Sequence, residues 1–319
     1  MDGFTGHGSG RTPGPLGSST LVGGRIPGPQ RRRPVRVADA KPLSKKTFEM
    51  PNPGPGDSGR VRVHAVEWKL FDGGVSPSQV RQGRLANCPL ASILAALANT
   101  KVGRTRIDNI LKAAERHANV ETNLSGVLDK LDNDPESPTP KKITSKRYFA
   151  LTLAKNIETS DAFYTDNVDR DWNLFYMQHN EDRRIENRKD ILWPAVIEKA
   201  YAVQRGGYDK ISESKDLTLA VVWKDIAGKN PDGLKLEDKT DKEILDVVKA
   251  AGNVPAVAAS RKDSGIETDS SNKLTDDHGY AVLGLQGSKI ELYNPWGWKV
   301  SVSMKELRKY FELIQFGNP

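Results

Sequence analysis

The sequence predicts an α+β protein of two lobes that follows a disordered N-terminal tail, and three observations support this fold class. Helical patterns dominate the first half of the globular part, and strand patterns dominate its last quarter. The first 60 of the 319 residues are rich in Gly, Pro and Arg. Because helices and strands differ in their apolar period, we expect a helical lobe and an antiparallel β lobe with a cleft between them.

The tail is defined by its composition. Residues 1–60 hold 12 of the 28 glycines and 9 of the 19 prolines, so they bury too little apolar surface to offset the entropy of ordering. They also hold ten of the 48 Lys and Arg and four of the 41 Asp and Glu. The basic run at residues 31–36 (RRRPVR) fits either a solvated tail or a contact for an acidic partner or delivery machinery.

The remaining 259 residues, 61–319, carry only +1 of the formal net charge of +7. A nucleic-acid-binding core is therefore not expected. No stretch of 18 apolar residues occurs, which excludes a membrane span, and the N-terminus lacks the apolar region of a signal peptide. The single cysteine excludes a disulfide framework and Cys-rich metal sites. These features fit a cytoplasmic protein, or one exported without a cleaved signal peptide into a target cell.

Turn and capping signals divide the globular part into elements. Helices are expected over residues 89–99, 106–117 and 190–204, from the capping box at 240–243 to Gly252, and after Ser303, which is paired with Glu306. Strands are expected over residues 148–153, 254–259, 280–285, 289–293 and 300–303, with a hairpin turn at 286–288. Residues 132–140 are expected to form a loop.

Cys88 follows a loop and stands at the first turn of the apolar helix over 89–99. The positive end of a helix favours a thiolate and lowers the thiol pKa, and Pro89 suits the first helical position. Cys88 is therefore a candidate nucleophile. By itself, however, a lone cysteine is more often a buried, inert one.

His278 is the candidate base, because it stands where an apolar strand begins. His7 lies in the tail, His117 on the polar side of a predicted helix and His179 in a charged loop. Asn294 closes the next strand, and a hairpin brings the start of one strand beside the end of the next. The Asn294 carbonyl can then hold the imidazole in the useful tautomer.

Gln82 lies six residues before Cys88, across a short loop. Its side-chain amide, together with the Cys88 backbone N–H, can stabilise a developing oxyanion. A glutamine in a loop is usually only polar surface, so its value lies in the combination with Cys88, His278 and Asn294.

Four segments resemble the calpain family of papain-like cysteine peptidases. Residues 82–90 (QGRLANCPL) look like its nucleophile segment, and residues 192–202 (LWPAVIEKAYA) look like its structural helix. Residues 278–280 (HGY) and 294–297 (NPWG) resemble its His–Ala–Tyr and Asn–Pro–Trp–Gly elements. The segments keep the family order over about residues 76–315.

The resemblance implies a papain-like core of two lobes, at about residues 61–212 and 213–319. It implies a cysteine endopeptidase that acts inside a cell on protein substrates, with Cys88, His278 and Asn294 as its triad. Trp296 would shield the bond between the last two from water. A toxin or effector delivered into another cell and a housekeeping protease both fit. The alternatives are a transglutaminase-like acyltransferase on the same triad and a catalytically dead binding module.

The chain departs from the family pattern near the nucleophile. Residues 86–87 are Ala-Asn where the family has Gly-Asp, Pro89 replaces Trp, and Gly279 replaces Ala. No catalytic group is lost, but the family's substrate preference cannot be carried over. No cofactor is expected. Calcium activates animal calpains, yet the nearest loop, residues 132–136 (DNDPE), lacks the turn Gly and distal Glu of an EF-hand, so no metal site is mapped.

Overall fold

The computed structural model describes residues 47–66, 68–111, 117–132, 139–152, 155–166, 174–177, 191–212, 216–266 and 274–319. All of them belong to one compact unit, Leu43–Pro319. The helices are α1 (Cys88–Asn99), α2 (Lys101–Leu111), α3 (Trp193–Arg205), α4 (Leu219–Ala227), α5 (Asp241–Ala250) and α6 (Met304–Tyr310). Short 3-10 turns are η1 (Pro77–Gln79), η2 (Leu128–Lys130), η3 (Tyr208–Lys210) and η4 (Leu236–Asp238).

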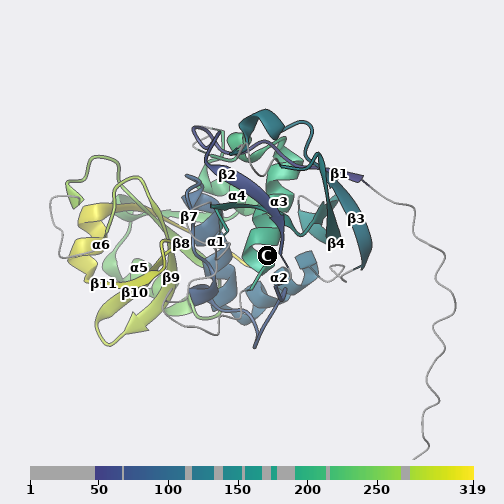
Figure 1. Ribbon diagram of the computed structural model, residues 1–319. Coiled ribbons are helices and arrows are strands. Elements are labelled where there is room, and N and C mark those ends of the chain that lie inside the picture. Colours follow the sequence, from purple (N-terminus) through teal and green to yellow (C-terminus); the bar gives the residue numbers. More distant parts are fainter. Residues whose placement is uncertain are drawn as a thin grey trace, which may run out of the picture. The chain divides into compact units, whose positions relative to one another are not determined.

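The strands of the described segments form three sheets, which confirms the α+β class (Figure 1). The largest has the order β11-β10-β9-β8-β12-β7 and is antiparallel throughout. Its strands are β7 (Asp232–Lys235), β8 (Ala256–Ser260), β9 (Gly279–Gln286), β10 (Lys289–Asn294), β11 (Trp298–Val302) and β12 (Phe311–Phe316). The expected hairpin of β9 and β10 and the expected third strand, β11, are confirmed.

The first half of the chain contains more strands than we expected, since only the strand over residues 148–153 was predicted there, and all but its last residue lies within β4 (Lys142–Thr152). A four-stranded sheet has the order β1-β3-β4-β5, with β1 parallel to β3, and β2 pairs with β6. These strands are β1 (Thr47–Glu49), β2 (Val61–Ala65), β3 (His117–Asn123), β4 (Lys142–Thr152), β5 (Lys155–Ser160) and β6 (Ala162–Asp166).

The six-stranded sheet is covered on both faces. Successive residues of a strand point to opposite faces, and the buried residues of β8 to β10 follow this rule. Val257, Ala281 and Tyr293 belong to the core built around α1. Ala258 and Tyr280 belong to a second core that also contains residues of α5 and α6. The sheet therefore joins the two cores.

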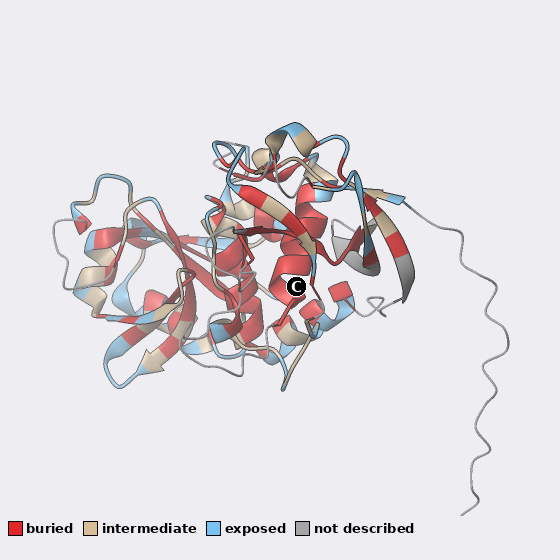
Figure 2. Cartoon of the chain, in the orientation of Figure 1, coloured by how far each residue is buried: buried red, intermediate tan, exposed pale blue. Residues whose placement is uncertain are grey.

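The first core includes most of α1, α3 and α4, and both α1 and α3 are largely buried (Figure 2). The second core begins at Leu234. The first core takes in α4 as far as Ala227, but it also contains Val257, Ala281 and Tyr293, so the two cores are not two separate segments of the chain. Helix α3 ends as predicted, because Gly206 adopts a left-handed φ of 96°.

Several helix boundaries differ from those expected. Helix α2 spans Lys101–Leu111 and His117 starts strand β3, so the helix predicted over residues 106–117 begins and ends earlier. Thr100 explains the early start, since its hydroxyl accepts the Gly103 N–H at 3.0 Å. Helix α5 ends at Ala250, two residues before Gly252. The capping boxes of Thr240 with Glu243 and of Ser303 with Glu306 are confirmed.

The folded part begins before residue 61. Strand β1 pairs with β3, and the N–H of the buried Met50 donates to the Asn123 carbonyl at 3.1 Å. The Gly54 N–H donates to the Tyr176 hydroxyl, which in turn donates to the buried Asp57 at 3.2 Å. Residues 47–60 therefore belong to the folded unit and not to a tail. The rest of the expected tail, residues 1–46, lies outside the described residues.

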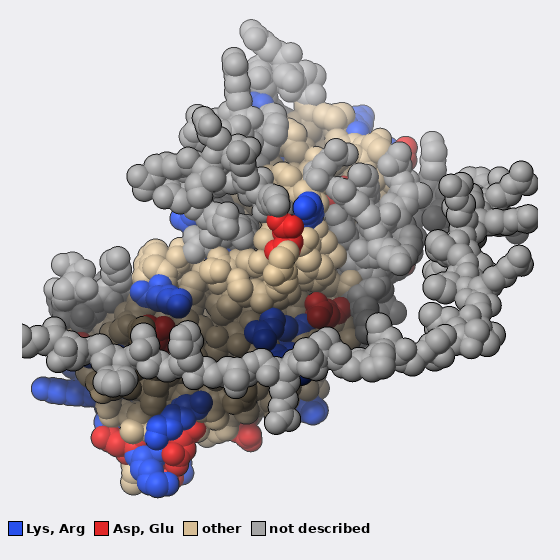
Figure 3. Space-filling view, turned by 90° about the horizontal axis from the view of Figure 1, so that it is seen from below, with Lys and Arg blue, Asp and Glu red and all other residues tan. Residues whose placement is uncertain are grey.

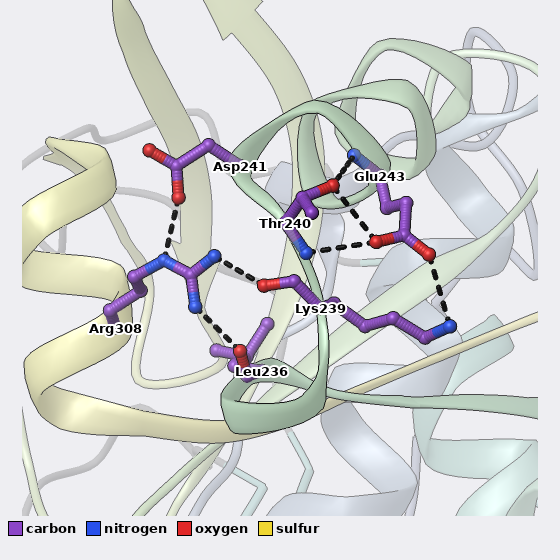
Figure 4. Close-up of polar contacts among 6 residues, drawn as sticks. All are labelled: Leu236, Lys239, Thr240, Asp241, Glu243 and Arg308. Carbon is purple, nitrogen blue, oxygen red and sulfur yellow. Dashed lines mark hydrogen bonds and ion pairs between the residues drawn. The ribbon is translucent and has the colours of Figure 1, made fainter.

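Arg308 of α6 joins the two helices of the second core (Figure 4). Its guanidinium donates to Asp241 Oδ1 at 2.6 Å, to the Leu236 carbonyl at 2.6 Å and to the Lys239 carbonyl. It thereby fixes the turn that leads into α5.

None of the helices in the described segments is both long and apolar enough to cross a bilayer. On the face drawn in Figure 3, the described Lys and Arg side chains alternate with Asp and Glu in small groups.

Candidate active site

Cys88 opens α1 at the wall of a cavity of about 920 Å³. Gln82, His278 and Trp296 line the same cavity. Asn87 occupies the N-cap position and Pro89 follows Cys88 in the first turn, as the sequence predicts. The structure thus brings together, around one cavity, residues from distant parts of the chain, with Cys88 and His278 separated by 190 positions.

Gly279 places the backbone after His278 directly on the first turn of α1. Its N–H hydrogen-bonds the Cys88 thiol. A Cβ at position 279 would lie 2.7 Å from the Ser92 hydroxyl oxygen and 3.6 Å from the Cys88 carbonyl oxygen. Only glycine fits there without movement, which explains why this chain has His–Gly–Tyr.

His278 is held by the end of β8. Its N–H donates to Ser260 Oγ at 2.9 Å, and its carbonyl accepts from the Ser260 N–H at 2.9 Å. The preceding residue, Asp277, has a left-handed φ of 49°, a conformation that is uncommon outside glycine but better tolerated by Asp and Asn. The backbone at His278 is therefore fixed on both sides.

The bond between His278 and Asn294 defines the tautomer of the imidazole. Asn294 Oδ1 accepts the Trp296 backbone N–H at 2.9 Å, which identifies this atom as the oxygen. It also lies 3.1 Å from His278 Nε2, so Nε2 must carry a proton and donate it. In a neutral imidazole, Nδ1 then keeps its lone pair and can act as a base.

Aromatic rings surround this bond. The Trp296 ring lies 4.7 Å from the His278 ring, centroid to centroid, and the Tyr280 ring lies 4.9 Å away, edge to face. Asn294 is fully buried and His278 is 6% exposed. Trp296 lies where a shield for the bond between His278 and Asn294 is needed.

The segment that carries Gln82 is tied to the segment that carries Asn294. The Gln82 N–H donates to the Pro295 carbonyl at 2.7 Å, and the Tyr293 hydroxyl donates to the Val80 carbonyl at 2.8 Å. The Gln82 side chain donates one Nε2 proton to the Leu85 carbonyl at 2.7 Å. Gln82 also lines the cavity.

Burial disfavours the thiolate of Cys88 and the imidazolium of His278. It raises the pKa of the Cys88 thiol, although the N–H groups of Gly279 and Cys88 oppose this. Our expectation of a lowered thiol pKa at a helix N-terminus is thus wrong, because desolvation outweighs the helix end. Burial also lowers the pKa of His278 to about 4, opposed by the Asn294 bond and the Asp277 charge. At neutral pH the free protein therefore holds a thiol and a neutral imidazole.

The cavity wall combines apolar and acidic groups. Described carboxylates on it are Asp276, Asp277 and Glu312. Apolar residues on it include Leu90, Leu217, Leu219, Val222 and Leu313. Among the described residues, no group of three His, Cys, Asp or Glu side chains is placed to hold a metal ion. Asp134 and Glu136 of the loop considered for calcium lie outside the described residues.

One protein-family model matches the chain, that of the calpain family of cysteine proteases, over residues 148–306. The chain belongs to this family. It is accordingly a cysteine-type endopeptidase, a hydrolase. The matched calpain-family segment includes His278, Asn294 and Trp296, so both C-terminal motifs lie within it. Gln82 and Cys88 precede the segment. A comparison with curated proteins gave no match.

Several residues that hold the calpain-family site escaped the sequence reasoning. Ser260, Gly279 and Asp277 fix His278 through backbone contacts, which leave no pattern in a single sequence. Glu198 contacts Asn87 from α3. Two adjacent charged residues, Glu198 and Lys199, interrupt the apolar run at 192–202 and were a signal for such contacts, because buried charges need partners. His7 and His179, which we set aside, lie outside the described residues.

Proposed function

We propose that the protein cleaves peptide bonds of protein substrates with Cys88 as nucleophile, His278 as base and Asn294 as the residue that orients the base. The observation that carries this proposal is the buried bond from His278 Nε2 to Asn294 Oδ1, beside a cavity that Cys88 also lines. The family match supports the same proposal, because His278 and Asn294 both fall within the segment that matches the calpain family.

A papain-like arrangement of two lobes accounts for the two cores. Cys88 begins a helix of the first core, while His278 and Asn294 lie at the ends of strands that also build the second. In this arrangement the lobes meet at α1 and β9, and the cavity lies where they meet.

Attack begins from the neutral pair. His278 Nδ1 takes the thiol proton as Cys88 Sγ forms a bond to the substrate carbonyl carbon, and the carbonyl π electrons move to oxygen. The Asn294 carbonyl and the Asp277 charge both favour the imidazolium that results. The tetrahedral intermediate collapses when the C–N bond breaks and the imidazolium gives its proton to the leaving amine.

Water completes the cycle. His278 takes a proton from water as the oxygen attacks the thioester, and the C–S bond breaks to release the acid and the thiol. Gln82 would stabilise the oxyanion in both steps with its second Nε2 proton, together with the Cys88 N–H. The tie from Gln82 to Pro295 keeps this donor in place relative to Asn294.

The nucleophile is tested by labelling with an epoxysuccinyl peptide, which alkylates cysteine. We expect labelling at Cys88 and loss of casein cleavage in C88A with an unchanged melting temperature. Cleavage by C88A at the wild-type rate would exclude the proposal. The same labelling with calcium and with a chelator tests activation, and we expect no dependence on calcium.

Two other outcomes would identify the alternative functions. Capture of the acyl group by an added amine in preference to water would indicate a transglutaminase-like acyltransferase. A thiol no more reactive than free cysteine, with no cleavage of casein, would indicate a binding module on an inactive core.

The setting is proposed as well. A toxin or effector would use the basic run at residues 31–36 for an acidic partner or delivery machinery, and a cytoplasmic protease would not need it. Removal of residues 1–42 separates these cases, since it spares the folded unit. Activity should survive in both, and loss of transfer into a target cell would support the effector.

A further inference from the structure

A buried carboxylate contacts the residue that precedes the nucleophile. Glu198 lies in the middle of α3 and is only 1% exposed. Its Oε1 accepts the Asn87 Nδ2–H at 2.7 Å, and its Oε2 accepts the Met177 backbone N–H at 2.9 Å. Glu198 thus links α3 to the start of α1 and to the Met177 segment.

The Asn87 side chain does not cap α1, although Asn87 occupies the N-cap position. Asparagine at an N-cap usually accepts a backbone N–H of the first helical turn, but the Asn87 side chain makes no such bond. Its Nδ2 points to Glu198 instead, and its buried Oδ1 has no partner among the described residues. Because an unpaired buried oxygen is costly, the orientation is imposed by Glu198.

No described cation offsets the charge of Glu198. The tyrosines of its surroundings, Tyr164 of β6, Tyr176 and Tyr208 of η3, stay neutral because burial raises the pKa of each hydroxyl. The next residue, Lys199, donates to Ser160 and to the Ala162 carbonyl.

Asp57, another carboxylate, accepts a hydrogen bond from the Tyr176 hydroxyl. Because Glu198 is buried, its pKa is raised to about 7, although its hydrogen bonds to Met177 and Asn87 oppose this shift.

We propose that Glu198 is a positioning residue of the active site, whose ionised carboxylate fixes Asn87 and so the first turn of α1 that carries Cys88. The inference rests on the proposed role of Cys88 as nucleophile. The two oxygens of an ionised carboxylate accept both bonds at once. Protonation turns one oxygen into a donor, so that either Asn87 or Met177 loses its acceptor.

The consequence is a dependence of Cys88 on a group that never touches the substrate. As pH falls through about 7, Glu198 takes up a proton and the first turn of α1 loosens. His278, with a pKa of about 4, stays neutral over most of that range. Lys199, whose pKa burial lowers to about 7, titrates in the same range. A loss of reactivity near pH 7 is therefore assigned to Glu198 only if E198Q removes it.

The test is the inactivation of the full-length protein by an epoxysuccinyl peptide between about pH 5 and 9. For the wild type, we expect the maximal rate of inactivation to fall about 30-fold from pH 8 to 5.5, as for one group that titrates at about 7, with little change in inhibitor affinity. In E198Q this inflection should vanish. Because the Gln amide is neutral, like the protonated carboxyl, the rate should stay near the low value of the acid form at every pH.

Two further variants keep the test informative. N87D sets a second carboxylate against Glu198, so the two share a proton and the inflection should move to higher pH. The double variant N87D/E198Q restores a donor–acceptor match and should again lack the inflection. A purely structural role of Glu198 would change the melting temperature in these variants without moving the inflection.

The inference is overturned if the wild type shows no inflection near 7, or if the inflection persists in E198Q or stays in place in N87D. Those results differ from a failure of the proposed function. If C88A still cleaves casein, or if the epoxide does not label Cys88, then the assignment of the nucleophile is at fault.

Discussion

Gly279 lies directly against Ser92, at a distance that leaves no room for a side chain. A Cβ on Gly279 would come within 2.7 Å of the Ser92 hydroxyl and 3.3 Å of its Cβ. We expect G279A to push β9 away from α1, to cost ~1–3 kcal/mol of stability and to lower the rate of casein cleavage at least tenfold. The Gly279 N–H would then no longer reach the thiol.

The variant S92A provides the matched control, because it removes the closest atom. Alone it should keep the wild-type rate, and with G279A it should restore part of the lost rate. Equal defects in the single and double variants would show that the contact with Ser92 is not the cause.

Asn294 should tune the base. N294D keeps an oxygen for His278 Nε2 and for the Trp296 N–H but adds a buried negative charge. The imidazolium is then favoured, so the pKa of His278 should rise from about 4. In an E198Q background, the remaining acid loss of activity near pH 4 should move upward by at least one pH unit. An unmoved profile would contradict the assignment of His278 as the base.

The N-terminal boundary can be measured with two truncations. Removal of residues 1–42 should leave the melting temperature and activity unchanged, because it spares the folded unit. Removal of residues 1–60 also takes β1, Met50 and Asp57, and we expect a lower melting temperature from the lost burial and hydrogen bonds. Equal melting temperatures for the two truncations would show that residues 47–60 add nothing to the fold.

Glu198 should reduce stability at neutral pH. Its pKa of about 7 in the folded protein lies above its ordinary value of 4.5. Its contribution to folding is therefore fully present below pH 4.5 and lost as pH rises through 7. The stability of E198Q relative to the wild type should grow by about 3 kcal/mol between pH 4 and 8, as measured by urea unfolding. A difference that is constant with pH would contradict the raised pKa.

Arg308 should matter for stability alone. R308A removes donors to Asp241 and to two backbone carbonyls, and we expect it to cost ~1–3 kcal/mol. R308K should recover only part of this, since one ammonium cannot reproduce the planar fork of the guanidinium. Casein cleavage at room temperature should stay at the wild-type rate in both. A large loss of activity in a stably folded R308A would point to coupling between α6 and the cavity.

Capping and hairpin signals made the second half of the chain predictable. Thr240 and Ser303 predict the starts of their helices, and residues 286–288 predict the turn between β9 and β10, because local side-chain and backbone chemistry determines caps and turns. Of the four-stranded sheet of the first half, only part of β4 was predicted, for the opposite reason. Strands such as β3 (HANVETN) and β5 (KNIETS) are polar, so alternation of apolar residues does not mark them.

The candidate site shows the same division. Cys88, His278 and Asn294 were identified from motifs, and the structure places His278 and Asn294 in hydrogen-bond contact. The direction of the Cys88 pKa shift was wrong, because the sequence shows the helix start but not the depth of burial. The contact between Glu198 and Asn87 spans 111 positions and depends on packing that one sequence does not reveal.

The position of α1 determines when this protein can complete its folding during synthesis. This helix is apolar, and part of its cover is supplied by β8 and β9, which emerge from the ribosome more than 150 residues later. Asn99, at its end, likewise waits for the carbonyls of Ala251 and Leu283. Contacts of such long range form slowly and leave an apolar helix exposed to chaperones until synthesis ends. In a nascent chain, Cys88 and His278 therefore cannot meet around one cavity until β8 and β9 have been synthesised.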